Sequence, residues 1–230
     1  RDSIYINNDT VEIRDASRLK GLSTFDTADA IQKEAGDAAS VLAIGPAGEN
    51  LVPFAVVQSE GASGSGGMGA VMGAKNLKAI AVAGNRRPTA ARPERLRELI
   101  KIIKDNKAGS TMPSMWADPQ KVEAHAHNCY GCGIGCYREL YTVDGRQYKS
   151  LCQQSMIYEH FLKMPRKDAI ELLGSRLCDG YGMDTSVIQS MIEFLDFCYK
   201  AGVINECQTG LPLSHIGSTE FSEKFMRMVA

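Results

Sequence analysis

The stretch LKAIAVAGNRRPTAARPERLRELIKIIK, residues 77–104, contains the change of pattern that decides the fold class of this chain. Its first seven residues form an apolar and β-branched run typical of a strand. After the turn-forming segment 85–88, the leucines and isoleucines of Pro93–Lys104 recur at the spacing of one helix face. The sequence therefore predicts an α+β protein, with a β-rich domain at 1–88 and a mostly helical domain at 89–230.

Strand-like segments occupy most of the chain before this boundary. Five of them have the expected alternation or β-branched content: Ser3–Ile6, Val11–Ile13, Ser40–Ile44, Val52–Val57 and Leu77–Ala83. The first two predict a hairpin that turns at Asn7–Asp9. Between the second and the third, Thr24–Ala35 predicts a helix, with Asp26 or Thr24 as its cap and Gly36 at its end.

The chain after the boundary has the helical period. Lys167–Leu177 and Thr185–Ala201 repeat the spacing seen in Pro93–Lys104. The Ser, Met and Pro content of Gly109–Pro119 predicts a loop, followed by a short helix that leads into a group of cysteines.

Composition limits the classes of function. The 230 residues include 26 Lys and Arg against 27 Asp and Glu, so no basic field favours nucleic acid or an anionic membrane as a partner. No run approaches the roughly 20 apolar residues of a membrane span, and no leader precedes a cleavage site. Seven clustered cysteines, an odd number, favour a reducing compartment over a disulfide framework, so we expect a cytoplasmic protein. The chain begins at Arg1 and stops inside an amphipathic pattern, from which we expect a fragment of a larger enzyme.

Three cysteines lie close together in NCYGCGIGCYRE, residues 128–139. Cys129, Cys132 and Cys136 have the spacing of thiolates that wrap one iron–sulfur cluster, and the intervening glycines tolerate a tight loop. A structural zinc site or inert buried thiols are the alternatives, although no second ligand pair follows. The fourth ligand lies outside this chain or comes from the remaining cysteines: Cys152, Cys178, Cys198 and Cys207.

The densest glycine segment is GASGSGGMG at 61–69. Backbone amides in such a loop form an anion-binding concavity for the phosphates of a large cofactor. An ordinary flexible loop is the alternative, since the segment matches neither the Rossmann nor the P-loop spacing.

Two further motifs contain glycine with acidic residues. IGPAGEN at 44–50 turns a strand end toward the same cofactor, or else forms a tight turn with a solvated Glu49. In DGYGMD at 179–184, Asp184 is placed to cap the helix that follows. Asp179 is then a candidate acceptor for the N–H donors of a heterocycle.

These four motifs occur in the same order in the aldehyde:ferredoxin oxidoreductase family of tungsten enzymes, which the chain resembles over nearly its whole length. The resemblance implies tungsten, or molybdenum, held by the dithiolenes of two pyranopterins beside a [4Fe–4S] cluster, with Mg between the pterin phosphates as a further expectation. It also implies a β-rich pterin-binding domain, to which the 1–88 domain contributes the C-terminal part, and largely helical domains after it.

The resemblance assigns roles to individual residues. The three clustered cysteines look like the first three cluster ligands. The residues expected to bind cofactor are Ala62, Gly64, Ser65, Asp179, Met183 and Asp184. Family members commonly carry arginines where this chain has Gly61 and Ser65, which removes two cations from the phosphate loop. Gly133 replaces the usual proline of the cysteine run.

A cysteine distinguishes two branches of this resemblance. Cys152 stands near the position of a glutamate in the aldehyde oxidoreductases, and a cysteine there resembles the metal-binding residue of class II benzoyl-CoA reductase. A thiolate suits a soft metal, while a small buried hydrophobic residue is the alternative. Glu159 and His160 are the acid–base candidates, with a packed surface pair as the alternative. His125 and His127 flank the cluster loop and are candidates to tune it.

The function implied is oxidation of an aldehyde to a carboxylic acid, with electrons passed to ferredoxin or an iron–sulfur partner subunit. One alternative is the catalytic subunit of a benzoyl-CoA reductase-like enzyme acting on an acyl-CoA. Another is a non-enzymatic electron-transfer subunit that has lost the pterins. A homo-oligomer is consistent with the family resemblance.

Overall fold

A computed structural model describes residues 1–36, 38–59, 62–86, 89–107, 124–126, 139–143, 146–150 and 170–230. The chain forms two compact units. The first comprises Arg1–Gly84 with Gln154–Ala230, and the second comprises Asn85–Gln153. The division of the protein into domains at residue 88 stays a prediction.

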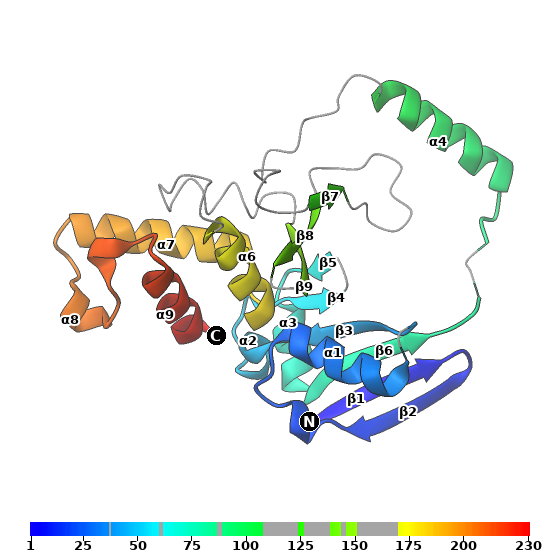
Figure 1. Ribbon diagram of the computed structural model, residues 1–230, viewed down its shortest axis with the longest axis horizontal. Coiled ribbons are helices and arrows are strands. Elements are labelled where there is room, and N and C mark those ends of the chain that lie inside the picture. Colours follow the sequence, from blue (N-terminus) through cyan, green and yellow to red (C-terminus); the bar gives the residue numbers. More distant parts are fainter. Residues whose placement is uncertain are drawn as a thin grey trace. The chain divides into compact units, whose positions relative to one another are not determined.

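The first unit is built on a six-stranded mixed sheet with the order β2-β1-β6-β3-β4-β5. Strands β1 and β6 are parallel, and the other neighbours are antiparallel. Figure 1 shows the long strands of this sheet in blue to green. Their bounds are Asp2–Asn7 for β1, Thr10–Asp15 for β2, Ser40–Ile44 for β3, Val57–Ser59 for β4, Ala62–Gly64 for β5 and Leu77–Ala83 for β6.

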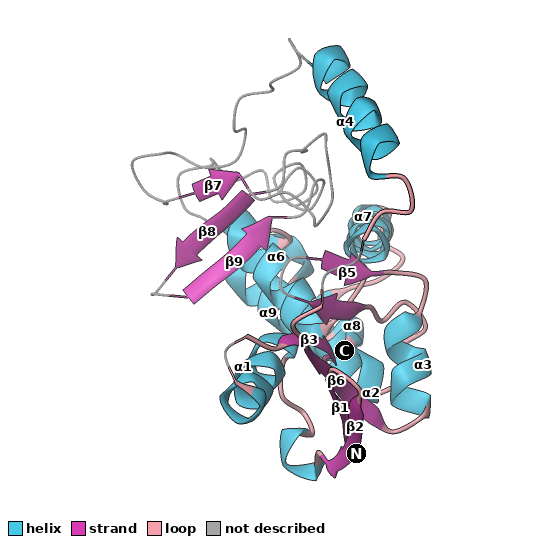
Figure 2. Cartoon of the chain, turned by 90° about the vertical axis from the view of Figure 1, so that its right-hand side faces the viewer, coloured by secondary structure: helices cyan, strands magenta, loops and turns pink. Residues whose placement is uncertain are grey.

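Helices cover both faces of this sheet, as the edge-on view in Figure 2 shows. Helix α1, Thr24–Ala35, buries Ile31 against Tyr5 of β1 and against alternate small and β-branched side chains of β3 and β6. On the opposite face, Met72 of α3, Met68–Ala74, packs with Ile44 and Val57. The short α2, Pro46–Glu49, and the 3-10 turn η1, Ser17–Leu19, complete this part of the unit.

The C-terminal helices form a second core within the same unit. It contains α6, Ile170–Tyr181, and α7, Thr185–Lys200, together with α9, Thr219–Val229. In this core Phe221 and Phe225 stack with ring centroids 5.5 Å apart, and both are almost completely buried. Between α7 and α9 lie α8, Glu206–Thr209, and the 3-10 turn η3, Leu213–His215.

The second unit contains a helix and a small sheet. Its helix is α4, Pro93–Lys107, and its antiparallel sheet has the order β7-β8-β9. These strands span Ala124–Ala126, Glu139–Val143 and Arg146–Ser150. This sheet was not predicted, although the pair Asp144-Gly145 between β8 and β9 is a hairpin signal.

Most of the predicted elements are confirmed. The first hairpin, β3, β6, α1, α4 and α7 lie where the sequence predicted them, and the α+β class is confirmed. The predicted strand Val52–Val57 is wrong, because the amide of Ala55 donates to the carbonyl of Val52 and turns the chain before β4 begins. The cap of α1 is also corrected, since the hydroxyl of Ser23 accepts the Asp26 amide at 3.0 Å.

Parts of the predictions lie outside the described residues, including Gly109–Pro119 and the start of the helix expected at Lys167. In the described part of the chain, no helix is long and apolar enough to cross a membrane.

Candidate functional site

The motif DGYGMD at 179–184 lies against the sheet in the first unit. Met183 forms an isolated antiparallel bridge with Ala55. Beside it, the amide of Val56 donates to the carbonyl of Gly182 at 2.8 Å. The motif, which runs from the last residues of α6 to the residue before α7, is therefore fixed to the segment just before β4.

Glycine allows this close approach of backbones. Gly182 ends α6 with a φ of 75°, in the left-handed region that favours glycine. Gly45, from the predicted IGPAGEN motif, lies against the same helix end, and a Cβ there would be 2.3 Å from the carbonyl oxygen of Tyr181. Two motifs far apart in the sequence thus meet at the end of α6.

The buried carboxylate of this site belongs to Asp179, which is 2% exposed. The hydroxyl of Thr24 at the start of α1 donates to its backbone carbonyl at 2.7 Å. The side-chain nitrogen of Gln58 donates to its carboxylate at 2.6 Å. A carboxylate accepts several hydrogen bonds, so the site offers an oriented acceptor away from bulk water.

Gln58 is a site residue that the sequence reasoning missed. It is 4% exposed, and its Oε1 has no hydrogen-bond partner among the described residues. The available signal was a single polar residue at the end of the apolar run FAVVQ, residues 54–58. A polar side chain within such a run is either satisfied by the fold or reserved for a ligand.

The predicted phosphate-binding residues lie beside Gln58. Strand β5 contains Ala62 and Gly64, and it pairs with β4 so that Gln58 stands opposite Ser63. Ser65 follows directly and is exposed. The structure thus brings these candidates to the strand next to the Asp179 contact, and their cofactor role stays a prediction.

Packing explains Gly69, at the end of the segment that the sequence assigned to anion binding, and also Gly73 beyond that segment. A Cβ on Gly73 of α3 would lie 1.8 Å from the carbonyl oxygen of Gly48 in α2. One on Gly69 would lie 2.6 Å from the carbonyl oxygen of Val56. These positions need glycine because backbones touch there. Gly67 likewise lies against the Pro53 carbonyl, so the anion-binding prediction then rests on residues 64–66.

The last two residues of the motif have clear structural contacts. Met183 is 1% exposed and belongs to the helical core. The carboxylate of Asp184 accepts the amide of Ser186 at 2.9 Å, so Asp184 caps α7 as predicted. Whether either residue also binds cofactor stays a prediction.

The alternative of a tight turn with a solvated Glu49 is wrong, because the Glu49 side chain is buried. Its carboxylate contacts the ammonium group of Lys78 at 2.5 Å, and the two side chains are 5% and 0% exposed. The backbone amide of Gly21 also donates to it at 3.1 Å. Burial lowers the pKa of Lys78, while its hydrogen bond to Glu49 acts in the opposite direction. This ion pair connects α2, which contains Glu49, to β6, which contains Lys78.

The predicted metal ligands lie outside the described residues. These are Cys129, Cys132, Cys136 and Cys152, and the same holds for Gly61, His127, Gly133, Glu159 and His160. Among the described cysteines, Cys178 and Cys198 are buried and Cys207 is exposed. The described segments contain no group of three or more side chains that could hold a metal ion.

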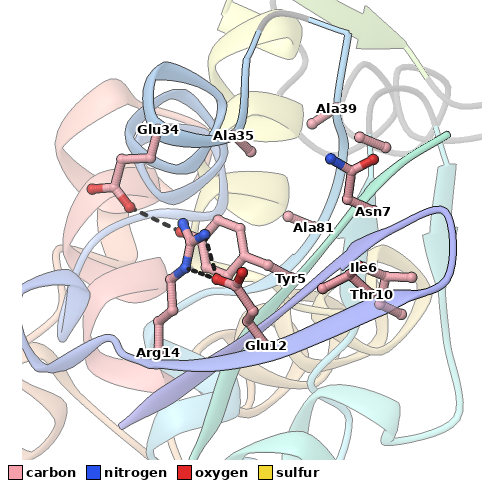
Figure 3. A pocket seen from close by; sticks show the side chains of 11 residues that line it. Tyr5, Ile6, Asn7, Thr10, Glu12, Arg14, Glu34, Ala35, Ala39 and Ala81 are labelled. Carbon is pink, nitrogen blue, oxygen red and sulfur yellow. Dashed lines mark hydrogen bonds and ion pairs between the residues drawn. The ribbon is translucent and has the colours of Figure 1, made fainter.

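A separate pocket of about 380 Å³ lies between the first hairpin and α1 (Figure 3). Tyr5 donates to Glu34 at 2.9 Å, and the guanidinium of Arg14 lies 4.0 Å from the centre of the Tyr5 ring. Burial and the hydrogen bond to Glu34 raise the pKa of Tyr5. No residue predicted to bind cofactor lines this pocket, and its charged groups already contact one another.

Two family models together cover almost all of the chain. The model of "Aldehyde ferredoxin oxidoreductase, N-terminal domain" matches residues 2–84. The model of "Aldehyde ferredoxin oxidoreductase, domains 2 & 3" matches residues 57–230.

Individual relatives carry the same description. The tungsten-containing aldehyde ferredoxin oxidoreductase of Pyrococcus horikoshii is 31% identical over an alignment 277 residues long. This alignment covers 99% of this chain and 45% of the relative. That of Thermococcus kodakarensis is 32% identical over 275 residues, covering 99% and 44%. The chain thus spans less than half the length of these relatives.

A solved structure is similar over the same extent. It is the active site complex BamBC of benzoyl coenzyme A reductase with 1,5 dienoyl-CoA, with a TM-score of 0.78 and 26% identity. The match covers 99% of this chain and 42% of that chain. A shorter similarity, 37% over 97 residues, joins 36% of this chain to 16% of the aliphatic sulfonate oxidoreductase WOR-like subunit of Pyrococcus furiosus.

Proposed function

The chain belongs to the aldehyde ferredoxin oxidoreductase family, and from this premise we propose that it is part of a tungsten or molybdenum bispterin, iron–sulfur oxidoreductase. The proposed reaction oxidises an aldehyde to a carboxylic acid, with water as the source of oxygen and ferredoxin as the acceptor of two electrons, one at a time. When bound, the metal–pterin group supplies the two-electron chemistry at the carbonyl carbon.

The single observation that carries this proposal is the burial of the Asp179 carboxylate within the DGYGMD motif. A carboxylate held away from bulk water suits the N–H donors of a pterin ring. The residues described here therefore fit the organic part of the cofactor. Ala62, Gly64 and Ser65 are proposed to bind its phosphates from the adjoining strand and loop, with Mg between the phosphates.

The remaining roles follow from the sequence. Cys129, Cys132 and Cys136 are proposed to hold the [4Fe–4S] cluster. Glu159 and His160 are proposed to hold or move the proton that the substrate loses, since geometry and a shifted pKa decide such roles. Ferredoxin or an iron–sulfur subunit is the proposed partner, in a cytoplasmic assembly.

A second candidate function is reduction of an activated aromatic thioester. It is favoured by the similarity to the benzoyl coenzyme A reductase complex and by Cys152. Replacing Cys152 with Ser and measuring the metal by X-ray absorption tests its role, because an unchanged number of sulfur neighbours excludes ligation.

Turnover assays separate the two chemistries. The full-length protein, prepared anaerobically, is supplied with aldehydes and an oxidised acceptor, or with benzoyl-CoA and a reductant. Aldehyde oxidation alone supports the first proposal, and reduction of benzoyl-CoA alone supports the second.

A third candidate is an electron-transfer subunit without pterins. Its motivation is Gly61 and Ser65, where family members commonly carry arginines. Iron without tungsten or molybdenum in the purified protein would favour this candidate over both enzymes.

A further inference from the structure

We propose that Gln58 is a pterin-binding residue that works as a pair with Asp179: its amide nitrogen orients the carboxylate, and its amide oxygen accepts from the same ring edge. This inference rests on the proposed function. It assigns a residue that neither the motifs nor the glycine loop identified.

The contact fixes which way the amide points. The Gln58 nitrogen lies 2.6 Å from a carboxylate oxygen of Asp179, a distance suited to a hydrogen bond with an ionised partner. The reverse orientation would place two acceptors at that distance. The amide nitrogen of Gln58 therefore donates to Asp179. The amide oxygen, on the other side of the same group, is left to accept a hydrogen bond from a ligand.

The amide oxygen is the group that calls for a ligand. Gln58 is only 4% exposed, yet its side-chain oxygen Oε1 has no hydrogen-bond partner among the described residues. Buried polar atoms in folded proteins are nearly always hydrogen-bonded, so an orphan acceptor needs a donor from elsewhere. The Asp179 carboxylate and the Gln58 amide oxygen form two adjacent acceptors. Such a pair suits two adjacent donors, such as the amino group and the neighbouring ring N–H of a pterin.

Two other orphan atoms lie on the elements that meet at Asp179. Ser175 precedes Asp179 by one turn of α6, and Thr27 follows Thr24 by one turn of α1; both are fully buried. Their hydroxyl oxygens also lack partners among the described residues. Thr24 itself donates to the Asp179 carbonyl. Unsatisfied polar groups thus gather on the three elements around one carboxylate.

The backbone around Gln58 is suited to hold a ligand. Strand β4 pairs with β3 on one side and β5 on the other, so that Gln58 stands opposite Ala43 and Ser63. A side chain on a strand paired at both edges keeps its orientation better than one on a loop. The same strand pair leads directly to the predicted phosphate-binding residues Ala62 and Gly64.

The test compares variants of the full-length protein isolated anaerobically with its cofactors. Gln58→Met keeps the volume and removes both polar atoms. The matched control is Gln32→Met, since Gln32 also donates a side-chain hydrogen bond, to the Ala39 carbonyl at 3.2 Å. The readouts are pterin released per iron atom and the rate at which tungsten is lost on dialysis.

The expected result is a roughly tenfold to hundredfold faster loss of pterin and tungsten from Gln58→Met, with Gln32→Met close to wild type. Wild-type retention in Gln58→Met would overturn the inference and leave the proposed function intact. A wild-type protein that contains no pterin would overturn both.

A second variant decides the question if Gln58→Met does not accumulate. Gln58→Glu keeps the shape, and when protonated it donates to Asp179 as the amide does. Pterin retention in this variant is therefore expected to fall as the pH rises, because two adjacent carboxylates repel once both are ionised. Retention that follows the wild-type pH profile would overturn the inference.

Discussion

At the scale of single residues, the ion pair between Lys78 and Glu49 shows what a motif can conceal. The sequence places Glu49 in a turn and Lys78 in a strand, and nothing in their spacing indicates that they meet. Only the sheet brings them together, with both side chains almost completely buried. A buried charge without its partner is costly, so this contact constrains the position of α2 on the sheet.

Lys78→Met is expected to lower the free energy of unfolding by about 3 kcal/mol, because the buried Glu49 carboxylate loses its 2.5 Å ammonium contact and keeps the Arg1 guanidinium only at 3.8 Å. Urea denaturation measures the change. The matched control is Lys200→Met, which removes an exposed pair with Asp196 and is expected to cost less than about 0.5 kcal/mol. Equal losses in the two variants would contradict the role given to burial.

Ionisation of Tyr5 is expected to make the free energy of unfolding depend on pH. Burial, then the hydrogen bond to Glu34, raises its pKa above the ordinary value of 10.0. Above this pH the unfolded chain loses the phenol proton while the folded chain keeps it, so the contribution of Tyr5 to stability falls as the pH rises toward the folded pKa.

The free energy of unfolding, measured from about pH 9 to about pH 11, is therefore expected to decline more steeply in wild type than in Tyr5→Phe. The variant lacks the group that titrates. Parallel declines in the two proteins would show that Tyr5 ionises alike in both states.

At the scale of elements, the periods of the sequence predicted the first hairpin, β3, β6, α1, α4 and α7, because each has a continuous pattern with clear end signals. They failed at Val52–Val57, where the Ala55 amide donates to the Val52 carbonyl and closes a turn. Pro53 stands at the second position of this turn, a local signal that the apolar run obscured. The periods also missed the β7-β8-β9 sheet, although only Asp144 and Gly145 separate β8 from β9, and an Asp-Gly pair between two strands is typical of a hairpin.

The site was predicted in part for the same reason. Motifs identified Asp179, Ala62 and Gly64. In the structure, Ala62 and Gly64 lie on β5, next to the strand of Gln58, and Gln58 contacts Asp179. Gln58 was not predicted, because its contact joins two elements 121 positions apart in the chain. Long-range pairing of this kind depends on the fold rather than on local spacing.

The contact between α2 and α3 gives the sharpest prediction for element packing. Gly73→Ala would place a Cβ 1.8 Å from the Gly48 carbonyl oxygen, so the helices must separate. We expect a loss of about 3 kcal/mol in the free energy of unfolding, measured with urea. Gly84→Ala is the control, since its Cβ would meet its nearest neighbour, in Asn8, at an ordinary 3.5 Å. A neutral Gly73→Ala would contradict the packing described.

The start of α7 separates a capping role from a cofactor role for Asp184. Asp184→Ala is expected to cost about 1 kcal/mol, because the Ser186 amide loses its acceptor. Asp184→Asn keeps a side-chain acceptor and is expected to retain stability. Reduced pterin content in the stable Asn variant would support the cofactor role, and unchanged content would limit Asp184 to capping.

At the scale of the whole molecule, the chain combines a mixed sheet with helices that bring the DGYGMD motif to the end of that sheet. Its relatives in Pyrococcus horikoshii and Thermococcus kodakarensis are more than twice as long and are tungsten-containing enzymes. We therefore propose that, in the full-length protein, the buried acceptors around Asp179 bind a metal–pterin group.

Metal and pterin analysis of that protein, isolated anaerobically from its native host, tests this claim most directly. We predict iron together with tungsten or molybdenum, and a pterin that is released on denaturation. A protein that contains none of these metals and no pterin would contradict the account.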